Sequence, residues 1–385
     1  MRTICVVTGS RAEYGLLSRL MRMIKDNAET HLQVVATNMH LQAEYGETYK
    51  EIENDGFTID SRIPMPKPSD DAEGVVKSMS VELAGLASEL KRLHPDMIVI
   101  LGDRYEMLMV ASAALIFGIP VAHLHGGEIT EGAFDDAIRH AITKMSHLHF
   151  TSTEEYRQRV VQMGEEPAKV FCVGAIGVDN IKKINLLDKE EVEKYIGFKL
   201  DRDTVLATYH PVTLANSSLE ADMDAFLSAL EEISGLRVIF TMPNSDTGGD
   251  IVAGKISRFV EHHRDKAVAF KSLGMRRYLS VIPHVAAVVG NSSSGILEVP
   301  SFGIPTLNIG ERQKGRIASK SVVNCGNDKA SIVEGLKKVL SEEMREIAGK
   351  AKNPYEKADT VEHIFEIIKS YPLENLVKKK FHDIK

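Results

Sequence analysis

Short apolar runs rich in β-branched residues alternate with amphipathic helical stretches along nearly the whole chain. Six runs fall in the first half, at 3–8, 32–37, 97–102, 119–124, 148–152 and 169–174. Five more follow, at 204–209, 237–242, 267–271, 285–290 and 305–310. Near-continuously apolar strands separated by helices are typical of parallel sheets covered on both faces. The pattern therefore predicts an α/β protein.

The run at 204–209 begins a second series of strands, so we expect two doubly wound, Rossmann-like domains, which suits a length of 385 residues. The first domain comprises 1–176 together with C-terminal helices at 354–385 that cross back to it, and the second comprises 177–353. Open parallel sheets bind ligands at the carboxyl ends of their strands. We therefore expect the ligand in a cleft between the two domains.

Net charge, cysteine usage and the absence of long apolar runs bear on the expected partners, metal or disulfide sites and cellular location. A net charge of −7 gives no reason to expect nucleic acid or a membrane as partner. Cys5, Cys172 and Cys325 lie far apart and form no CxxC pair, which argues against a disulfide framework or a structural zinc site. The sequence shows neither a signal peptide nor an apolar run long enough for a membrane span, so a cytoplasmic protein is expected.

Polar residues follow the strands of the first half. Arg11 stands in TGSRAEYG (8–15), which has the outline of an anion site at a helix start, although GxGxxG and the P-loop are both absent. Asp103 and Arg104 follow the strand at 97–102 in GDRYE. The plainer alternatives are a surface arginine in an ordinary turn and an aspartate that only caps a helix.

The stretch HLHGGEITEGAFDDAIRH (123–140) is the densest in groups that titrate or bind metal. Three interpretations are open: a metal site, an acid/base centre, or one core histidine with one helix cap. The metal site is disfavoured because the strong two-histidine helix motifs are absent. An acid/base centre would use the imidazoles and carboxylates of this stretch, with an arginine one turn into the helix. These candidates are His123, His125, Glu128, Asp135, Asp136 and Arg139.

The second half offers residues suited to a diphosphate. Ser292 and Ser293, in GNSSSGILEV (290–299), are expected at a helix N-terminus, with Glu298 one turn into that helix. The alternative is a Ser-rich capped helix without a ligand. Three further candidates follow other strands of this half: His210, Asn244 and Arg312.

Taken in order, GSRAEYG, GDR, HLHGGE, FDDAIRHAITK, YHPV, GNSSSGILEV and GERQKGR resemble the hydrolysing UDP-N-acetylglucosamine 2-epimerases over nearly the whole chain. The animal bifunctional enzyme is similar in its epimerase half. This resemblance implies the glycosyltransferase-B architecture and anti elimination of UDP to a 2-acetamidoglucal. Addition of water then gives N-acetylmannosamine for sialic-acid-type biosynthesis, with no metal or cofactor and with a homo-oligomer, a dimer or tetramer, as the expected assembly.

The resemblance also implies roles by position. The positions that hold UDP in the family match Arg11, His210, Asn244, Ser292, Ser293, Glu298 and Arg312, and Arg104 matches a further ligand-binding position. The groups around the sugar match Asp103, His123, Glu128, Asp135 and Asp136. His125 stands where the non-hydrolysing epimerases and the animal enzyme carry a carboxylate, which leaves open the group that takes the C2 proton. Gly15 replaces a serine that contacts UDP in the animal enzyme.

Three alternatives stay open from the sequence. Related enzymes of legionaminic acid synthesis act on UDP-2,4-diacetamido-2,4,6-trideoxyglucose or on a GDP-linked sugar, and no residue fixes the contacts at C4 and C6. A glycosyltransferase of the same fold would need an acceptor site. A nucleotide-sugar binder without catalysis would show no turnover. We expect UDP-N-acetylglucosamine as the substrate.

Overall fold

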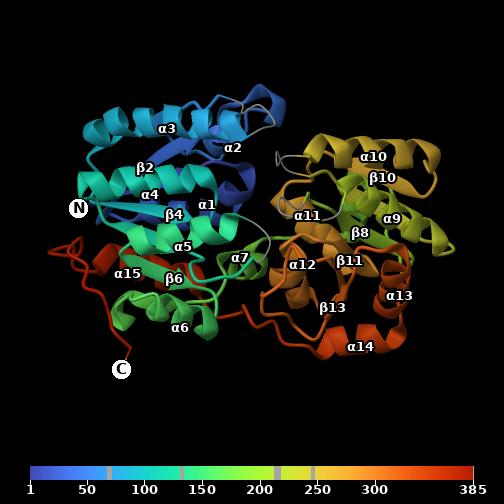
Figure 1. The fold of residues 1–385 in the computed structure, drawn as a ribbon. Coiled ribbons are helices and arrows are strands. Elements are labelled where there is room, and N and C mark those ends of the chain that lie inside the picture. Colours follow the sequence, from blue (N-terminus) through green and yellow to red (C-terminus); the bar gives the residue numbers. More distant parts are fainter. Residues whose placement is uncertain (67–71, 131–133, 212–217, 244–247, 385) are drawn as a thin grey trace. The chain divides into compact units, whose positions relative to one another are not determined.

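The computed structural model describes residues 1–66, 72–130, 134–211, 218–243 and 248–384. The chain divides into two compact units. Unit 1 consists of Met1–Glu128, Asp135–Asn180 and Lys357–Lys385, and unit 2 consists of Ile129–Phe134 and Ile181–Glu356. Figure 1 shows the elements of each unit.

The described part of unit 1 contains a seven-stranded parallel sheet in the order β3-β2-β1-β4-β5-β6-β7. Its strands are β1 (Arg2–Thr8), β2 (Thr30–Thr37), β3 (Ser61–Ile63), β4 (Met97–Leu101), β5 (Val121–Leu124), β6 (Leu148–Thr151) and β7 (Val170–Cys172). The central strands β4, β5 and β6 are buried along their whole length, as strands covered on both faces must be.

Helices cover both faces of this sheet, and each face has its own apolar core. One core joins the sheet to α1 (Arg11–Asp26), α2 (Tyr49–Asn54) and α15 (Thr360–Ser370). The other joins it to α3 (Ala72–Leu93), α4 (Tyr105–Phe117) and α5 (Asp135–Met145). Two further helices, α6 (Glu154–Gln162) and α7 (Ile176–Lys183), follow β6 and β7.

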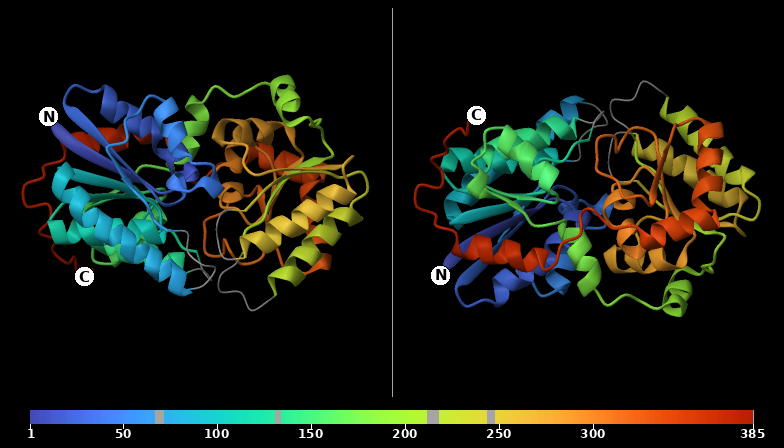
Figure 2. Two further views of the ribbon diagram at one scale, coloured as in Figure 1. Left: turned by 90° about the horizontal axis from the view of Figure 1, so that it is seen from above. Right: turned by 90° about the horizontal axis from the view of Figure 1, so that it is seen from below.

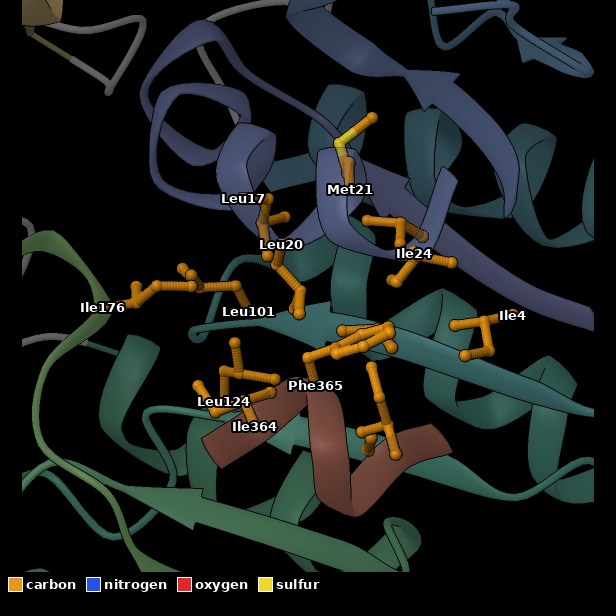
Figure 3. Packing of buried hydrophobic residues seen from close by; sticks show 14 of the residues in the cluster. Ile4, Leu17, Leu20, Met21, Ile24, Leu101, Leu124, Ile176, Ile364 and Phe365 are labelled. Atoms are coloured by element: carbon orange, nitrogen blue, oxygen red, sulfur yellow. The ribbon is translucent and has the colours of Figure 1, made fainter. Parts of the chain in front are cut away.

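The C-terminal helix α15 returns to unit 1, as the sequence predicts. Its buried side chains Ile364 and Phe365 lie against Leu17, Leu20 and Ile24 of α1 (Figure 3). Figure 2 shows this red helix lying across the sheet of unit 1.

The expectation of further helix beyond Pro372 is wrong, because residues 371–384 form turns and irregular backbone. Lys379 explains this path: its ammonium group donates to the carbonyls of Lys144 and Ser146 and pairs with the buried carboxylate of Glu165 at 2.7 Å. These contacts hold the tail in a conformation that is not helical.

The described part of unit 2 contains a six-stranded parallel sheet in the order β10-β9-β8-β11-β12-β13. Its strands are β8 (Thr204–Thr208), β9 (Arg237–Thr241), β10 (Ala267–Phe270), β11 (Ala287–Gly290), β12 (Thr306–Ile309) and β13 (Val322–Cys325). One face carries α9 (Leu219–Glu232), α10 (Gly249–His262) and α13 (Lys329–Val339). The other carries α8 (Lys189–Ile196) and α11 (Met275–Val281).

Two short helices complete unit 2: α12 (Ser294–Leu297) and α14 (Glu342–Lys350). Within the described ranges, none of the helices combines the length and the apolar character that crossing a membrane requires.

Candidate active site

Asp103 follows β4 and forms an ion pair with Arg139 of α5. Arg139 is 1% exposed, and it also donates to the main-chain carbonyl of Glu128 at 2.8 Å and to the Asp136 carboxylate at 3.2 Å. A buried guanidinium is costly unless its charge and its N–H groups are matched. The N-cap of α4 is Arg104, without a side-chain cap, so Asp103 does not act as the cap of that helix.

His125 and Glu128 form a dyad directly after β5. His125 Nδ1 lies 2.8 Å from Glu128 Oε1, and the hydroxyl of Ser152 donates to the same oxygen at 3.1 Å. Glu128 is 2% exposed. Among the described residues, Nε2 of His125 is buried and has no hydrogen-bond partner. One imidazole nitrogen is therefore fixed by a carboxylate, while the other remains available for proton transfer.

The backbone of His125 departs from the strand. Strand β5 ends at Leu124, and His125 has a φ of 66°, in the left-handed region that non-glycine residues seldom adopt. The two histidines of the HLH motif therefore do not share one face of a strand. Strain of this kind persists where the surroundings hold it, often at functional sites.

His123 lies inside the sheet and is fully buried. Its Nε2 lies 2.8 Å from the carbonyl oxygen of Gly102, and its Nδ1 lies 3.3 Å from the hydroxyl of Thr143. Burial lowers the pKa of His123 to about 3 against the opposing effect of the Gly102 carbonyl. The ring is therefore neutral at physiological pH, and it ties the end of β5 to the loop after β4.

Asp135 and Asp136 begin α5, as the sequence predicts. Asp136 is in contact with Arg139 and lies 3.5 Å from Nε2 of His140. The structure therefore brings Asp103, Glu128, Asp136 and Arg139 into one connected group.

Arg104 and Arg11 each pair with a glutamate that was not predicted as part of the site. Arg104 Nε lies 2.6 Å from Oε1 of Glu106, and Arg11 Nε lies 2.9 Å from Oε2 of Glu51. Glu106 is completely buried, unlike Glu51. A glutamate two residues after GDR, on an otherwise apolar helix start, is the signal in the sequence that could have identified it.

In unit 2, Asn291 follows β11 and connects the segment after β8 with the segment after β12. Its carboxamide accepts from the main-chain N–H of His210 at 2.7 Å and donates to the carbonyl of His210 at 2.8 Å. The main-chain carbonyl of Asn291 accepts hydrogen bonds from the side chains of Arg312 at 3.1 Å and Gln313 at 2.9 Å. The predicted residues His210 and Arg312 thus meet at one buried asparagine, which the sequence reasoning treated only as a turn residue.

The Ser-rich segment differs from the expected helix, in which Glu298 was to lie one turn from the start. Helix α12 has only four residues, Ser293 is its N-cap, and Glu298 follows its last residue. The reason is Pro300, which cannot donate to an α-helical bond and opens a 3-10 helix instead. The hydroxyl of Tyr278 donates to Ser294 at 3.0 Å and so supports the segment from α11. Ser292 and Ser293 are partly exposed, and Asn244 lies outside the described residues.

The structure therefore connects Asp103, Glu128, Asp136 and Arg139 in unit 1, and it brings His210 and Arg312 together at Asn291 in unit 2. In the described part of the chain, no three His, Cys, Asp or Glu side chains are grouped in a way that fits a metal ion.

Two doubly wound parallel sheets of this kind define a glycosyltransferase-B-like protein, and solved structures agree. A putative UDP-N-acetylglucosamine 2-epimerase from Listeria monocytogenes matches with a TM-score of 0.80 at 17% identity, over 100% of this chain and 99% of that one. The Neisseria meningitidis UDP-GlcNAc 2-epimerase, solved with UDP-GlcNAc bound, matches with a TM-score of 0.80 at 17% identity, over 96% and 99%.

The family model described as UDP-N-acetylglucosamine 2-epimerase matches residues 22–369, and the chain belongs to this family. A relative from Campylobacter jejuni, named GDP/UDP-N,N'-diacetylbacillosamine 2-epimerase (hydrolyzing), is 43% identical over 84% of both chains. Polysialic acid biosynthesis protein P7 of Escherichia coli is 38% identical over 100% of this chain and 98% of its own. The UDP-N,N'-diacetylbacillosamine 2-epimerase (hydrolyzing) of Legionella pneumophila is 34% identical over 99% of both.

Proposed function

We propose that this protein is a hydrolysing 2-epimerase of a nucleoside-diphosphate sugar that carries a 2-acetamido group. The observation that carries the proposal is the His125–Glu128 dyad, whose second imidazole nitrogen is buried and has no partner among the described residues. Removal of a weakly acidic C2 proton needs a base held at a fixed orientation. The hydrolysing relatives support the same reaction type.

For the substrate, we propose UDP-2,4-diacetamido-2,4,6-trideoxyglucose, the UDP-linked form of N,N'-diacetylbacillosamine. Two of the three relatives named above are named for this sugar: the name of the one at 43% identity gives its GDP- or UDP-linked form, and the name of the one at 34% gives its UDP-linked form. The name of the third gives a pathway and no substrate. The order expected from the sequence is therefore reversed, and UDP-N-acetylglucosamine becomes the second candidate.

The reaction balances as an elimination followed by an addition. A base takes the proton from C2, the C1–O bond to the diphosphate breaks, and a C1–C2 double bond forms. Water then adds at C1 while a proton returns to C2 from the opposite face. The products are UDP and the free manno-configured sugar, and the proposal needs no cofactor or metal.

Residue roles follow from the contacts. His125 Nε2 exchanges the proton, because Glu128, which accepts a hydrogen bond from Ser152, fixes the opposite side of the imidazole ring. Asp103, Asp135 and Asp136 are proposed to act around the sugar, with Arg139 holding Asp103 in place. His123 is proposed to position the loop, since both of its ring nitrogens are already engaged, by the Gly102 carbonyl and the Thr143 hydroxyl.

The remaining predicted residues are proposed to bind the nucleotide. Ser292 and Ser293 would meet phosphate oxygens and Glu298 the ribose, while cationic side chains stabilise the departing diphosphate. The cationic and polar side chains in this group are Arg11, Arg104, His210, Asn244 and Arg312.

The test is turnover without an acceptor. The protein is incubated in D2O with either UDP-sugar, and the products are followed by NMR. We expect UDP release, inversion at C2 and deuterium at C2, with kcat/KM at least about tenfold higher for the diacetamido sugar, a difference of about 1.4 kcal/mol.

Each alternative gives a different result. Without an acceptor, a glycosyltransferase would release UDP only by hydrolysis, with the configuration at C2 retained and no deuterium there, and a binder would release none. No UDP release from either sugar would exclude the proposal. A higher kcat/KM for UDP-N-acetylglucosamine would restore the substrate expected from the sequence.

We further propose a homo-oligomer. Leu115, Ile116 and Phe117 end α4 with 47%, 84% and 41% of their surfaces exposed, and such apolar patches are common at contacts between subunits. A solution mass of 42.5 kDa by light scattering would contradict this.

A further inference from the structure

Three carboxyl side chains lie buried behind the loops that follow β1 and β4. Glu82 of α3 and Glu106 of α4 are completely buried, and Glu13 of α1 is 6% exposed. Among the described residues, the Oε2 atoms of Glu82 and Glu106 have no hydrogen-bond partner. Buried carboxyl groups are costly unless they are paired or protonated, so this cluster calls for a role beyond packing.

Gly9 connects two of these carboxyl groups. Its N–H donates to Oε2 of Glu13 at 2.7 Å, as part of the turn that starts α1. A Cβ atom at position 9 would lie 2.7 Å from Oε1 of Glu106 and 2.9 Å from its Cγ. The carboxyl group of Glu106 therefore lies against the loop backbone, at a spot that only glycine leaves open.

Glu106 also fixes Arg104. Its Oε1 lies 2.6 Å from Nε of Arg104, whose side chain is 21% exposed. A charged hydrogen bond at Nε sets the plane of the guanidinium group, since the five N–H groups are rigidly arranged. One buried carboxylate thus determines the orientation of the arginine beside the loop of Gly9.

We propose that Glu106 is a positioning residue that holds Arg104 in the orientation that binds a nucleoside diphosphate, and that Glu13 permits this only while it carries a proton. The inference rests on the proposed function, because it takes a diphosphate as the ligand. It adds a residue and a condition of binding that the proposed function does not contain.

The electrostatics of the cluster support this. Burial and, after it, the charge of Glu106 raise the pKa of Glu13 to about 8, against the opposing effects of Arg104 and of the Gly9 and Ser10 N–H groups. The pKa of Glu82 is also raised, first by burial and then by Glu106. At neutral pH Glu13 therefore carries a proton, while Glu106 pairs with Arg104. The charged groups that act on Glu13 are Glu106 and Arg104 of the α4 start, and Glu13 in turn acts on Glu82 of α3. Tyr105 lies beside Glu106, Arg104 and Glu82.

Ionisation of Glu13 places a second negative charge beside Arg104, so the affinity for a diphosphate falls as the pH rises through about 8. The terminal phosphate of UDP loses its last proton near pH 6, by analogy with other phosphate monoesters whose second pKa is about 6. A change in affinity between pH 7 and 8.8 therefore reports on the protein.

The experiment measures the dissociation constant of UDP by calorimetry from pH 7 to 8.8 for the full chain. Wild type should lose at least about threefold in affinity over this range, while Glu13→Gln should show no loss. Glu106→Gln should bind UDP about tenfold more weakly at pH 7, or about 1.4 kcal/mol. In Glu106→Gln, the affinity for UDP should also begin to fall at a lower pH, because the charge that raises the pKa of Glu13 is gone.

Glu73→Gln is the matched control, since Glu73 is an exposed glutamate on the same helix as Glu82. It should follow wild type at every pH. In turnover, Glu106→Gln should raise KM with kcat within about threefold of wild type, as expected when binding rather than chemistry is weakened.

The inference fails if Glu13→Gln keeps the wild-type loss of affinity, or if Glu106→Gln binds UDP as tightly as wild type. If Glu106→Gln does not fold, the profile of Glu13→Gln still decides. If the protein turns over the sugar nucleotide but its affinity for UDP does not change with pH, this inference is overturned and the proposed function stands. If the affinity for UDP changes with pH as predicted but there is no turnover, the proposed function is overturned and this inference stands. If wild type does not bind UDP, both are overturned.

Discussion

At the scale of single residues, His125 offers a way to separate stability from function. Its φ of 66° is unfavourable for histidine and favourable for glycine. We predict that His125→Gly lowers kcat at least about 100-fold, because the proton carrier is lost, while the melting temperature stays equal or rises. Steady-state turnover and thermal unfolding measure the two effects.

His94 is the matched control, since it also has a positive φ, of 51°, and is exposed at the end of α3. His94→Gly should raise stability without changing turnover. Turnover by His125→Gly at the wild-type rate would remove the imidazole from the mechanism, and a large fall in its melting temperature would show that the ring is structural.

The positions of the candidate residues on the fold were predictable, but their pairing was not. HLHGGE and FDDAIRH were placed correctly at the end of β5 and the start of α5, because they directly follow an apolar run and begin a helix. Their proposed acid/base role stays a prediction. The pairing of Asp103 with Arg139 spans 36 residues and depends on how α5 packs beside β4 and β5, which no local pattern encodes. The turn at His125 was likewise missed, since an imidazole in the left-handed region is uncommon.

At the scale of elements, α15 is the clearest case of a distant segment that completes a core. Phe365 is 3% exposed and lies between the sheet and α1 (Figure 3). We predict that Phe365→Ala lowers the free energy of unfolding of unit 1 by about 3–5 kcal/mol through the cavity it leaves. Urea unfolding measures this, with the exposed neighbour Glu366→Ala as control, for which we expect a change within about 0.5 kcal/mol. Equal effects of the two changes would mean that α15 is not part of the core.

Element prediction succeeded where apolar runs were long and failed where they were short. Strands β3 and β13 were missed, because SRI and VVNC are edge strands of only three and four residues. Helix α12 is shorter than the sequence indicated, because Pro300 cannot donate an α-helical hydrogen bond and a 3-10 helix follows. The tail beyond Pro372 takes its path from Lys379, whose partners Lys144, Ser146 and Glu165 lie more than 200 residues earlier in the chain.

At the scale of the whole molecule, buried titratable groups set the dependence of stability on pH. Glu13 is protonated when folded up to a pKa of about 8 but ionises near 4.5 when unfolded. The contribution of Glu13 to folding stability is therefore complete below about pH 4.5 and is lost as the pH rises through 8. His123 behaves oppositely: its pKa of about 3 when folded lies below the ordinary histidine value of 6.5, so its contribution to stability is complete above about pH 6.5 and is lost on acidification.

These two effects predict a maximum of stability between the acid and the alkaline limb. In melting curves from pH 4 to 9, Glu13→Gln should weaken the decline between pH 5 and 8 and raise the melting temperature at pH 8 by several degrees, because the neutral amide has no proton to lose. The part of the decline that remains belongs to Glu82, whose pKa is also raised by burial. The acid limb should remain, since it belongs to groups such as His123. The control Glu73→Gln should keep both limbs. A wild-type curve that is flat from pH 5 to 8 would mean that Glu13 ionises without cost in the folded chain, and the charge balance around Arg104 would then need a different explanation.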